Sequence, residues 1–370
     1  MKINQFSWTK SHGWDIPPEP QNHVNLVLVF AETDYFFDPI CYEDLRRLFP
    51  SAHIVGVSTA GNICGTDITD ASITISAVSF DRGSVKLFKI NPGDGHKTQE
   101  LVAELIEKIQ APDLRHLFVL TGGLSVDGTK LSAGLSAGNI PVTGGLAGDG
   151  PRFIKTWVMA DGPAEQNCIA ILAFFGDLEI HSGFSTGWVE FGIERVVTRS
   201  VGSTVFELDH APALETYAKY LGDRVDELPS SGLRFPLSAR KDENEIPVIR
   251  TLLGINKEEQ SLTFAGDIPQ GSLCRLMKTD IDSLIDASGI ATKKIMADHK
   301  GQTGLSLVVS CIGRRLVLGQ LSGEELEAIE DGVGQSFVMT GFYSYGELAP
   351  FNFHSCSLHN QTTSITVISE

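Results

Sequence analysis

A chain of 370 residues with 42% hydrophobic and 20% charged residues has the composition of a globular protein and is long enough for two domains. Its formal net charge of −17 argues against nucleic acid and anionic membrane surfaces as partners, because both attract Lys and Arg. The sequence shows no signal peptide, no apolar run long enough to cross a bilayer and no CxxC pair, so we expect a cytoplasmic protein with reduced thiols and no membrane insertion.

The first part of the chain alternates strand and helix patterns. Apolar runs at 24–30 and 52–58 predict buried strands, and residues 38–49 between them predict a helix with Asp38 as its N-cap. This β-α-β order is typical of a parallel sheet. The segments that follow predict a hairpin, an amphipathic helix and two strands that run into glycine turns, listed in that order: 72–90, 98–110, 116–123 and 140–150.

Strand-forming residues dominate the rest of the chain, with a second α/β segment beginning near residue 200. Strands are expected at 153–160, 167–175, 178–184, 192–198, 203–208, 246–255, 260–268, 271–278 and 304–313, and on both sides of 341–347. Helices are expected at 211–222, opened by Asp209 or His210; at 280–296, capped by Asp280; and from 322, where Ser322 and Glu325 match a capping box. Residues 223–244 are expected to form a loop.

The fold class that follows is mixed α/β, with two pseudo-related lobes of mixed β-sheets flanked by helices. We expect an N-terminal extension at 1–23, a first domain at 24–199 and a second at 200–368. The internal relationship rests on VGVSTAGN (55–62) and TGFYSYGE (340–347), in which Gly56 aligns with Gly341 and Gly61 with Gly346. The two turns would face one another across a shared cavity.

Glycine turns at strand ends free backbone N–H groups and allow a ligand to approach closely, although such glycines can also serve only to shape the turns. Polar side chains flank these turns, and Arg314 could grip a ligand carboxylate, with an ion pair to the acidic surface as its alternative. The predicted ligand-binding residues are Ser58, Thr59, Gly61, Gly145, Asp149, Arg314, Tyr343, Ser344, Tyr345 and Glu347.

Two further patterns point to other chemistries. GFSTG (183–187) matches the nucleophile elbow of hydrolases, but the residues after it predict extended chain rather than the helix that would expose Ser185. Metal is not expected, because Cys and His do not recur at ligand spacing. Haem needs only one axial histidine, and His181, His354 and His359 lie in strand-rich segments, so they are the residues for that alternative.

Taken together, the motifs resemble the FIST family, with FIST N and FIST C regions in tandem over about residues 24–368. The N-terminal match rests on IVGVSTAGN and VTGGLAGDG. The C-terminal match rests on VFELDHAPALETYAKYLG, VIRTLLGIN, LTFAGDIPQGSLCRLM, SCIGRR, GFYSYGELAP and LHNQTTSITVI. One departure is Asn62, where the family's first turn usually has Glu, so ligand selectivity is expected to differ here.

The resemblance implies a sensory protein rather than an enzyme, binding a small ligand such as an amino acid and signalling through a separate partner. With such a ligand, Arg314 would hold the carboxylate and Glu347 or Asp149 the ammonium, while Thr59 or Ser344 would add hydroxyl contacts. The alternative implied by some free-standing bacterial relatives is a haem-binding nitric-oxide sensor that acts on a histidine kinase. A serine hydrolase is the third reading.

Overall fold

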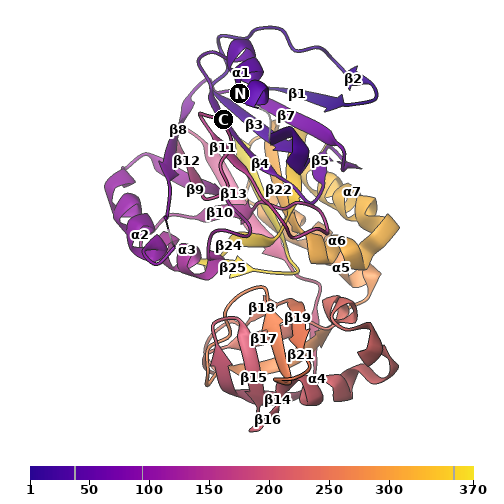
Figure 1. The fold of residues 1–370 in the computed structure, drawn as a ribbon. Helices are drawn as coiled ribbons and strands as arrows, with labels where there is room; N and C mark the ends of the chain where they lie inside the picture. Colours follow the sequence, from indigo (N-terminus) through magenta and orange to yellow (C-terminus); the bar gives the residue numbers. More distant parts are fainter. Residues whose placement is uncertain (37–38, 94, 353–354) are drawn as a thin grey trace.

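The computed structural model describes residues 1–36, 39–93, 95–352 and 355–370, so the expected N-cap Asp38 lies outside the described residues. The chain forms a large body and a smaller domain, residues 189–278, which lies below the body in Figure 1. The predicted mixed α/β class is confirmed. In the described part of the chain, no helix combines the length and apolar character needed to cross a bilayer.

Three mixed sheets build the body. In spatial order, the first sheet contains β11 (Val158–Ala160), β4 (His53–Ser58), β3 (Leu26–Ala31), β7 (Ser72–Ser79), β1 (Lys2–Thr9) and β2 (Gly13–Trp14). The second contains β25 (Ser355–His359), β24 (Gly346–Asn352), β10 (Val142–Leu146), β9 (Leu114–Thr121), β12 (Ile169–Gly176) and β8 (Gly83–Ile90). The third contains β13 (Glu179–Ser185), β26 (Thr363–Ser369), β22 (Gly304–Cys311), β23 (Phe337–Ser344), β5 (Asn62–Cys64) and β6 (Asp67–Thr69).

The three sheets repeat one pairing pattern. In each, a central strand pairs in parallel with the next long strand of its segment, as β3 does with β4, β9 with β10 and β22 with β23. On its other side the central strand pairs antiparallel with β7, β12 or β26, which in turn pairs antiparallel with β1, β8 or β13. The internal relationship that the sequence indicated for two copies therefore extends to three.

Each third of the body also lends a strand to a neighbour. The segment after β4 forms β5, which pairs with β23 of the third sheet. The segment after β10 forms β11, which pairs with β4 of the first, and the segment after β23 forms β24, which pairs with β10 of the second. The exchange is cyclic, so every sheet is completed by a strand from another third.

A glycine occupies the same position in the second parallel strand of each sheet. Gly56, Gly144 and Gly341 lie opposite Val29, Val119 and Val308, respectively. A Cβ at any of the three would overlap the carbonyl oxygen of its partner valine. Glycine is therefore required here by close backbone approach, which explains the repeated T/V-G pattern without reference to a ligand.

The centre of the body is a hydrophobic core shared by all three sheets. Phe30 of β3 and Phe342 of β23 stack with ring centroids 5.1 Å apart, and Phe118 of β9 belongs to the same buried cluster. Helices cover the outer faces (Figure 1): α1 (Pro39–Leu48), α2 (Thr98–Ile109), α3 (Gly128–Leu135), α5 (Ile281–Met296), α6 (Ile312–Leu318) and α7 (Ser322–Val333). Fully apolar strands such as LVLVFA in β3 are explained by this burial on both faces.

The smaller domain is a mostly antiparallel sheet with its own core. Its strands, in spatial order, are β18 (Val248–Arg250), β17 (Leu237–Arg240), β21 (Leu273–Lys278), β14 (Val189–Val201), β15 (Thr204–Leu208), β20 (Ser261–Phe264) and β19 (Leu252–Asn256), with β16 (Ala211–Pro212) paired to β15. Helix α4 (Ala213–Leu221) packs on it through Tyr217, and it ends at Gly222, as expected, with φ +57°.

Several local expectations differ from the structure. Residues 246–255 form two strands interrupted at Thr251, and of 153–160 only the last three residues are a strand. The expected loop 223–244 contains β17, the 3-10 helix η3 (Ser230–Arg234) and most of η2 (Gly222–Glu227), and the N-terminal extension contributes β1 and β2. Helix α4 begins after Pro212, because Asp209 and His210 have positive φ. The expected boundary between residues 199 and 200 falls inside β14, and the division at that point stays a prediction.

Candidate functional site

The glycine turns meet where the three sheets converge. The amide of Ala60 donates to the carbonyl of Tyr343 at 2.8 Å, the amide of Tyr345 to Leu146 at 3.1 Å, and the amide of Gly148 to Ser58 at 2.8 Å. These three bonds close a ring that links one turn from each third. The turns at Gly61 and Gly346 thus lie close together, and the N–H of Tyr343 also donates to the carbonyl of Gly61 at 2.8 Å.

The polar side chains beside these turns are satisfied internally. Thr59 donates to the Asn62 carboxamide oxygen at 2.6 Å, and Ser344 donates to the Glu347 carboxylate at 2.5 Å, so the two turns use the same three-residue spacing. Glu347 also accepts from the hydroxyl of Thr362 at 2.8 Å. Burial raises the pKa of Glu347 to about 8, outweighing the hydrogen bonds that lower it.

Asp149 organises the loop after β10. Its carboxylate, 1% exposed, accepts the backbone N–H groups of Phe153, Ile154 and Lys155 at 2.8 Å each. It also accepts the hydroxyl of Tyr345. The carboxylate therefore fixes Phe153 against Tyr345, and the two rings stack with centroids 4.3 Å apart and planes 12° from parallel.

Arg314 is a fully buried structural cation. Its guanidinium donates to Glu325 at 2.5 Å, to the carbonyls of Thr186 and Leu284 and to the hydroxyl of Ser288. The expected capping box is wrong, because Glu325 turns inward to Arg314 and the hydroxyl of Ser322 bonds to the carbonyl of Gly319. The sequence did not identify Glu325 as the partner of Arg314, because its position also fits the signal for the start of a helix.

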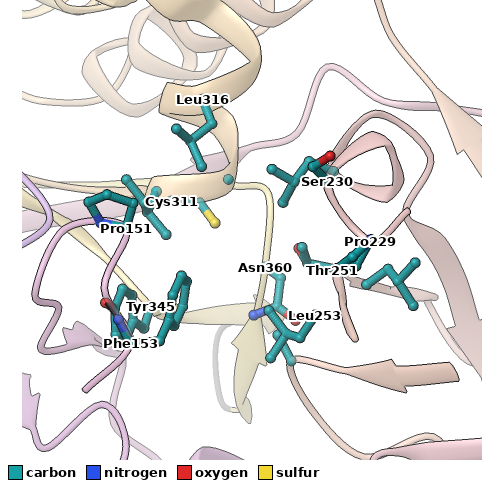
Figure 2. A pocket seen from close by; sticks show the side chains of 15 residues that line it. Pro151, Phe153, Pro229, Ser230, Thr251, Leu253, Cys311, Leu316, Tyr345 and Asn360 are labelled. Atoms are coloured by element: carbon teal, nitrogen blue, oxygen red, sulfur yellow. Dashed lines mark hydrogen bonds between the residues drawn. The ribbon is translucent and has the colours of Figure 1, made fainter. Parts of the chain in front are cut away.

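A cavity of about 350 Å³ lies beside these turns, between the body and the smaller domain. The body contributes the Phe153–Tyr345 pair, the C-terminal end of β22 and the first turn of α6. The smaller domain contributes η3 and the strands on either side of Thr251. The described lining residues are Pro151, Phe153, Pro229, Ser230, Leu233, Thr251, Leu252, Leu253, Ala265, Cys311, Ile312, Gly313, Leu316, Tyr345 and Asn360 (Figure 2).

The cavity is mostly apolar, and it continues into a second hollow of about 290 Å³ that shares Phe153, Leu253, Ala265 and Tyr345. Figure 2 shows Tyr345 on one side of the opening and Asn360 with Leu253 on the other. Such a hollow, with few polar groups among apolar walls, has the size and character of a small-molecule site.

Of the ten predicted ligand-binding residues, Tyr345 lines this cavity. Ser58, Thr59, Gly61, Asp149, Tyr343, Ser344 and Glu347 gather at the meeting point of the turns behind it; Gly145 packs against Val309; and Arg314 is bound to Glu325. A ligand-binding role for these residues stays a prediction. The sequence reasoning missed Phe153, Thr251 and Asn360, of which Asn360 lies in the quoted motif LHNQTTSITVI.

Ser185 does not stand at a nucleophile elbow. It ends β13, the chain continues into the long strand β14, and its hydroxyl lies 2.9 Å from that of Ser288 in a site only 4% exposed. The extended chain after Gly187 agrees with the expectation from sequence, and no helix N-terminus follows Ser185 to activate it.

The described histidines considered for haem lie away from this cavity. The described lining of the cavity contains no histidine. His359, 1% exposed, lies 3.2 Å from the carbonyl of Ala349, and its ring is tilted by 38° against that of Phe184 with centroids 4.4 Å apart. His181 is partly exposed on the third sheet. His354 lies outside the described residues. Neither described candidate lines this cavity or the second hollow that adjoins it.

His181 instead belongs to a small polar cluster at the opposite end of β22. The rings of His181 and His299 and the carboxylate of Glu179 bring three possible ligand atoms within 4.8 Å of one another. The Glu179 carboxylate accepts the N–H groups of Lys300 and Gly301 at 2.9 and 3.0 Å, and His299 lies 2.9 Å from the hydroxyl of Ser369. These contacts hold the turn after α5 against β13.

Comparison with known proteins places these features in a family. The chain is 24% identical over 317 residues to an uncharacterised protein of Methanocaldococcus jannaschii, covering 78% of this chain and 60% of that relative's length. Among solved structures, a cyanuric acid hydrolase aligns over 100% of this chain and 99% of its own, with 12% identity and a TM-score of 0.35. Residues 25–211 match the FIST N domain and residues 213–350 the FIST C domain, so the chain belongs to the FIST family.

Proposed function

We propose that this protein is a cytoplasmic sensor that binds a small ligand in the cavity between its body and its smaller domain and signals through a separate partner protein. FIST domains are in general sensory, ligand-binding domains of signalling proteins. The observation that carries the proposal is the cavity itself, because both parts of the chain line it.

The two parts are joined in a way that suits a sensor. The chain enters the smaller domain after Gly187 and leaves it at Thr279, and the hydroxyl of Thr279 donates to the carbonyl of Gly187 at 2.6 Å. Polar contacts cross the interface: Arg250 donates to the carbonyl of Leu358 at 3.0 Å and Gln361 to that of Leu233 at 3.1 Å. The backbone N–H of Asp267 donates to the hydroxyl of Thr129 at 3.5 Å. A ligand that touches both walls would favour one arrangement of the two parts over others.

The proposal does not depend on which ligand or which partner protein is involved. The amino-acid ligand and the histidine-kinase partner implied by the family resemblance stay predictions. The two side chains assigned to an amino acid, Arg314 and Glu347, are both fully buried and hydrogen-bonded within the protein. An amino acid would have to compete with those contacts.

The test is ligand binding with and without an open cavity. Mass spectrometry of the purified protein, followed by a thermal-shift screen of metabolites, would identify ligands, and a ligand present at 100 times its Kd should stabilise the fold by about 2.7 kcal/mol. Leu253→Trp should fill the cavity and abolish the shift, whereas Leu321→Trp, at a comparably exposed leucine away from the cavity, should preserve it. Equal shifts in both variants, or no ligand for the wild-type protein, would contradict the proposal.

A further inference from the structure

Asn360 presents an unsatisfied carboxamide at the cavity. It lies in the turn between β25 and β26, is 1% exposed, and neither its Nδ2 nor its Oδ1 has a hydrogen-bond partner in the described structure. Its side chain lines the cavity (Figure 2). Buried polar atoms are normally paired, so a carboxamide with both ends free at the wall of a hollow points to a group that enters from that hollow.

A second unsatisfied group comes from the smaller domain. The hydroxyl of Thr251 is also without a partner in the described structure, the residue is 4% exposed, and it lines the same cavity. Thr251 occupies the break between β18 and β19, where its carbonyl accepts the N–H of Ala265 at 2.9 Å. The backbone carbonyl there is satisfied, and the side-chain hydroxyl is left for a ligand.

The cavity offers no charge to pair with. Its described lining contains no Asp, Glu, Lys, Arg or His, and its two weakly acidic side chains are Cys311 and Tyr345. Burial raises the pKa of both, so both are neutral near pH 7. The adjoining second hollow adds two acidic side chains, Asp127 and Asp267, and its described lining holds no cation. A carboxylate, free or in a zwitterion, would therefore lose its hydration here without gaining a counter-ion, which disfavours both kinds of ligand.

The shape of the walls favours a flat group. Phe153 and Tyr345 form a stacked pair along one side, and Leu253 and Leu316 add aliphatic surface. Aromatic rings stack in offset arrangements on such a wall. On the other side, a carboxamide presents one donor and one acceptor side by side, and its complement is an edge with an adjacent acceptor and donor, as in the pairing of Asn with a base edge.

We propose that the cavity recognises an uncharged, flat ligand whose edge carries an adjacent hydrogen-bond donor and acceptor, as primary and cyclic amides do, and that Asn360 and Thr251 determine this specificity. The inference rests on the proposed function, since it names the ligand class of the same cavity. It replaces the amino acid implied by the family resemblance with a neutral amide.

The experiment compares neutral and charged ligands of the same shape. Benzamide, nicotinamide and uracil would be titrated by ligand-observed NMR against wild-type protein, alongside benzoate and phenylalanine as charged counterparts. We expect the amides to bind and the charged compounds to bind at least about ten-fold more weakly, since an unpaired buried charge costs more than a lost neutral hydrogen bond. Binding of the charged compounds alone, or of none of the amides, overturns the proposal.

Matched variants separate recognition from folding. Asn360→Leu and Thr251→Val each remove an unsatisfied polar group, so we expect unchanged or higher melting temperatures together with amide binding weakened about ten-fold. Thr74→Val is the control, because Thr74 is also buried with an unpaired hydroxyl but lies in β7, away from the cavity. It should leave binding unchanged.

Two results distinguish this inference from the proposed function. If charged metabolites bind and Leu253→Trp abolishes their binding, the cavity is a sensor site and the amide specificity is wrong. If the amides bind wild-type and Asn360→Leu protein equally, Asn360 does not hydrogen-bond the ligand. The inference then fails, even though the cavity binds a ligand.

Discussion

Removal of the buried cation Arg314 should be among the most damaging single substitutions in the body. Arg314 and Glu325 are both 0% exposed and joined by a 2.5 Å hydrogen bond between Nε and the carboxylate. Arg314→Met would leave the Glu325 carboxylate buried with only the hydroxyls of Ser288, Ser310 and Thr363 around it. An uncompensated buried charge of this kind costs about 3–5 kcal/mol of unfolding free energy.

Urea unfolding followed by tryptophan fluorescence would measure the effect, and Trp188 reports locally because it packs in a cluster with Leu284 and Leu318. The adjacent pair Arg315–Asp70 is a matched control, since it is also 2.5 Å long but Asp70 is 68% exposed. Asp70→Asn should therefore cost less than about 1 kcal/mol. The double variant Arg314→Met/Glu325→Leu should recover most of the loss, because it removes both charges and keeps apolar volume.

The result bears directly on the two readings of Arg314. If Arg314→Met lies within about 1 kcal/mol of wild type, below the range for a broken buried pair, the structural role is refuted. A ligand-binding role would then predict a lost ligand response with little loss of stability, and the two outcomes can be read from the same preparation.

Two further substitutions test the core of the body. Gly341→Ala should lower the free energy of unfolding by roughly 3 kcal/mol or more, because its Cβ would overlap the carbonyl of Val308. Gly323→Ala in α7, with open space around the added methyl, should be neutral or stabilising in thermal unfolding. Similar melting temperatures for both variants would contradict this expectation. The pKa of Glu347 is raised from 4.5 to about 8, so as pH rises the unfolded state releases the Glu347 proton before the folded state does. The free energy of unfolding should therefore fall as pH rises between these two values, with a limiting slope of about 1.4 kcal/mol per pH unit. Glu347→Gln should flatten that slope, and a difference between the two proteins that is constant across this window would be evidence against the shifted pKa.

The features that could be predicted from sequence are those with a local signature. The buried strand expected at 304–313 forms over 304–311, and its last two residues instead begin α6. Asp280 caps α5 as expected, accepting the N–H of Ser283 at 2.8 Å. The glycine turns were also visible, as was Gly222 at the end of α4. In each case the residues that decide the structure are neighbours in the chain.

The features that could not be predicted depend on contacts between distant segments. The polar residues of the turns suggested an open ligand site. The backbone hydrogen bond between Ala60 and Tyr343, which are far apart in the sequence, instead joins the two turns directly. Glu325 has the spacing of a capping box but instead forms a buried ion pair with Arg314. Thr251, Asn360 and Phe153 line the cavity and come from three separate segments, so no single sequence motif shows that they lie close together.

The lent strands have a consequence for how the body holds together. β5, β11 and β24 each cover the edge of a sheet to which their own segment does not otherwise belong. Freeing any one of them would uncover a row of unpaired backbone groups in the recipient, which is costly and prone to aggregation. No third of the body is complete by itself, so a proteolytic cut in the segment that carries one of these strands should weaken a distant sheet as much as its own. By contrast, the smaller domain, whose ends leave the body side by side, could be excised without opening the cycle.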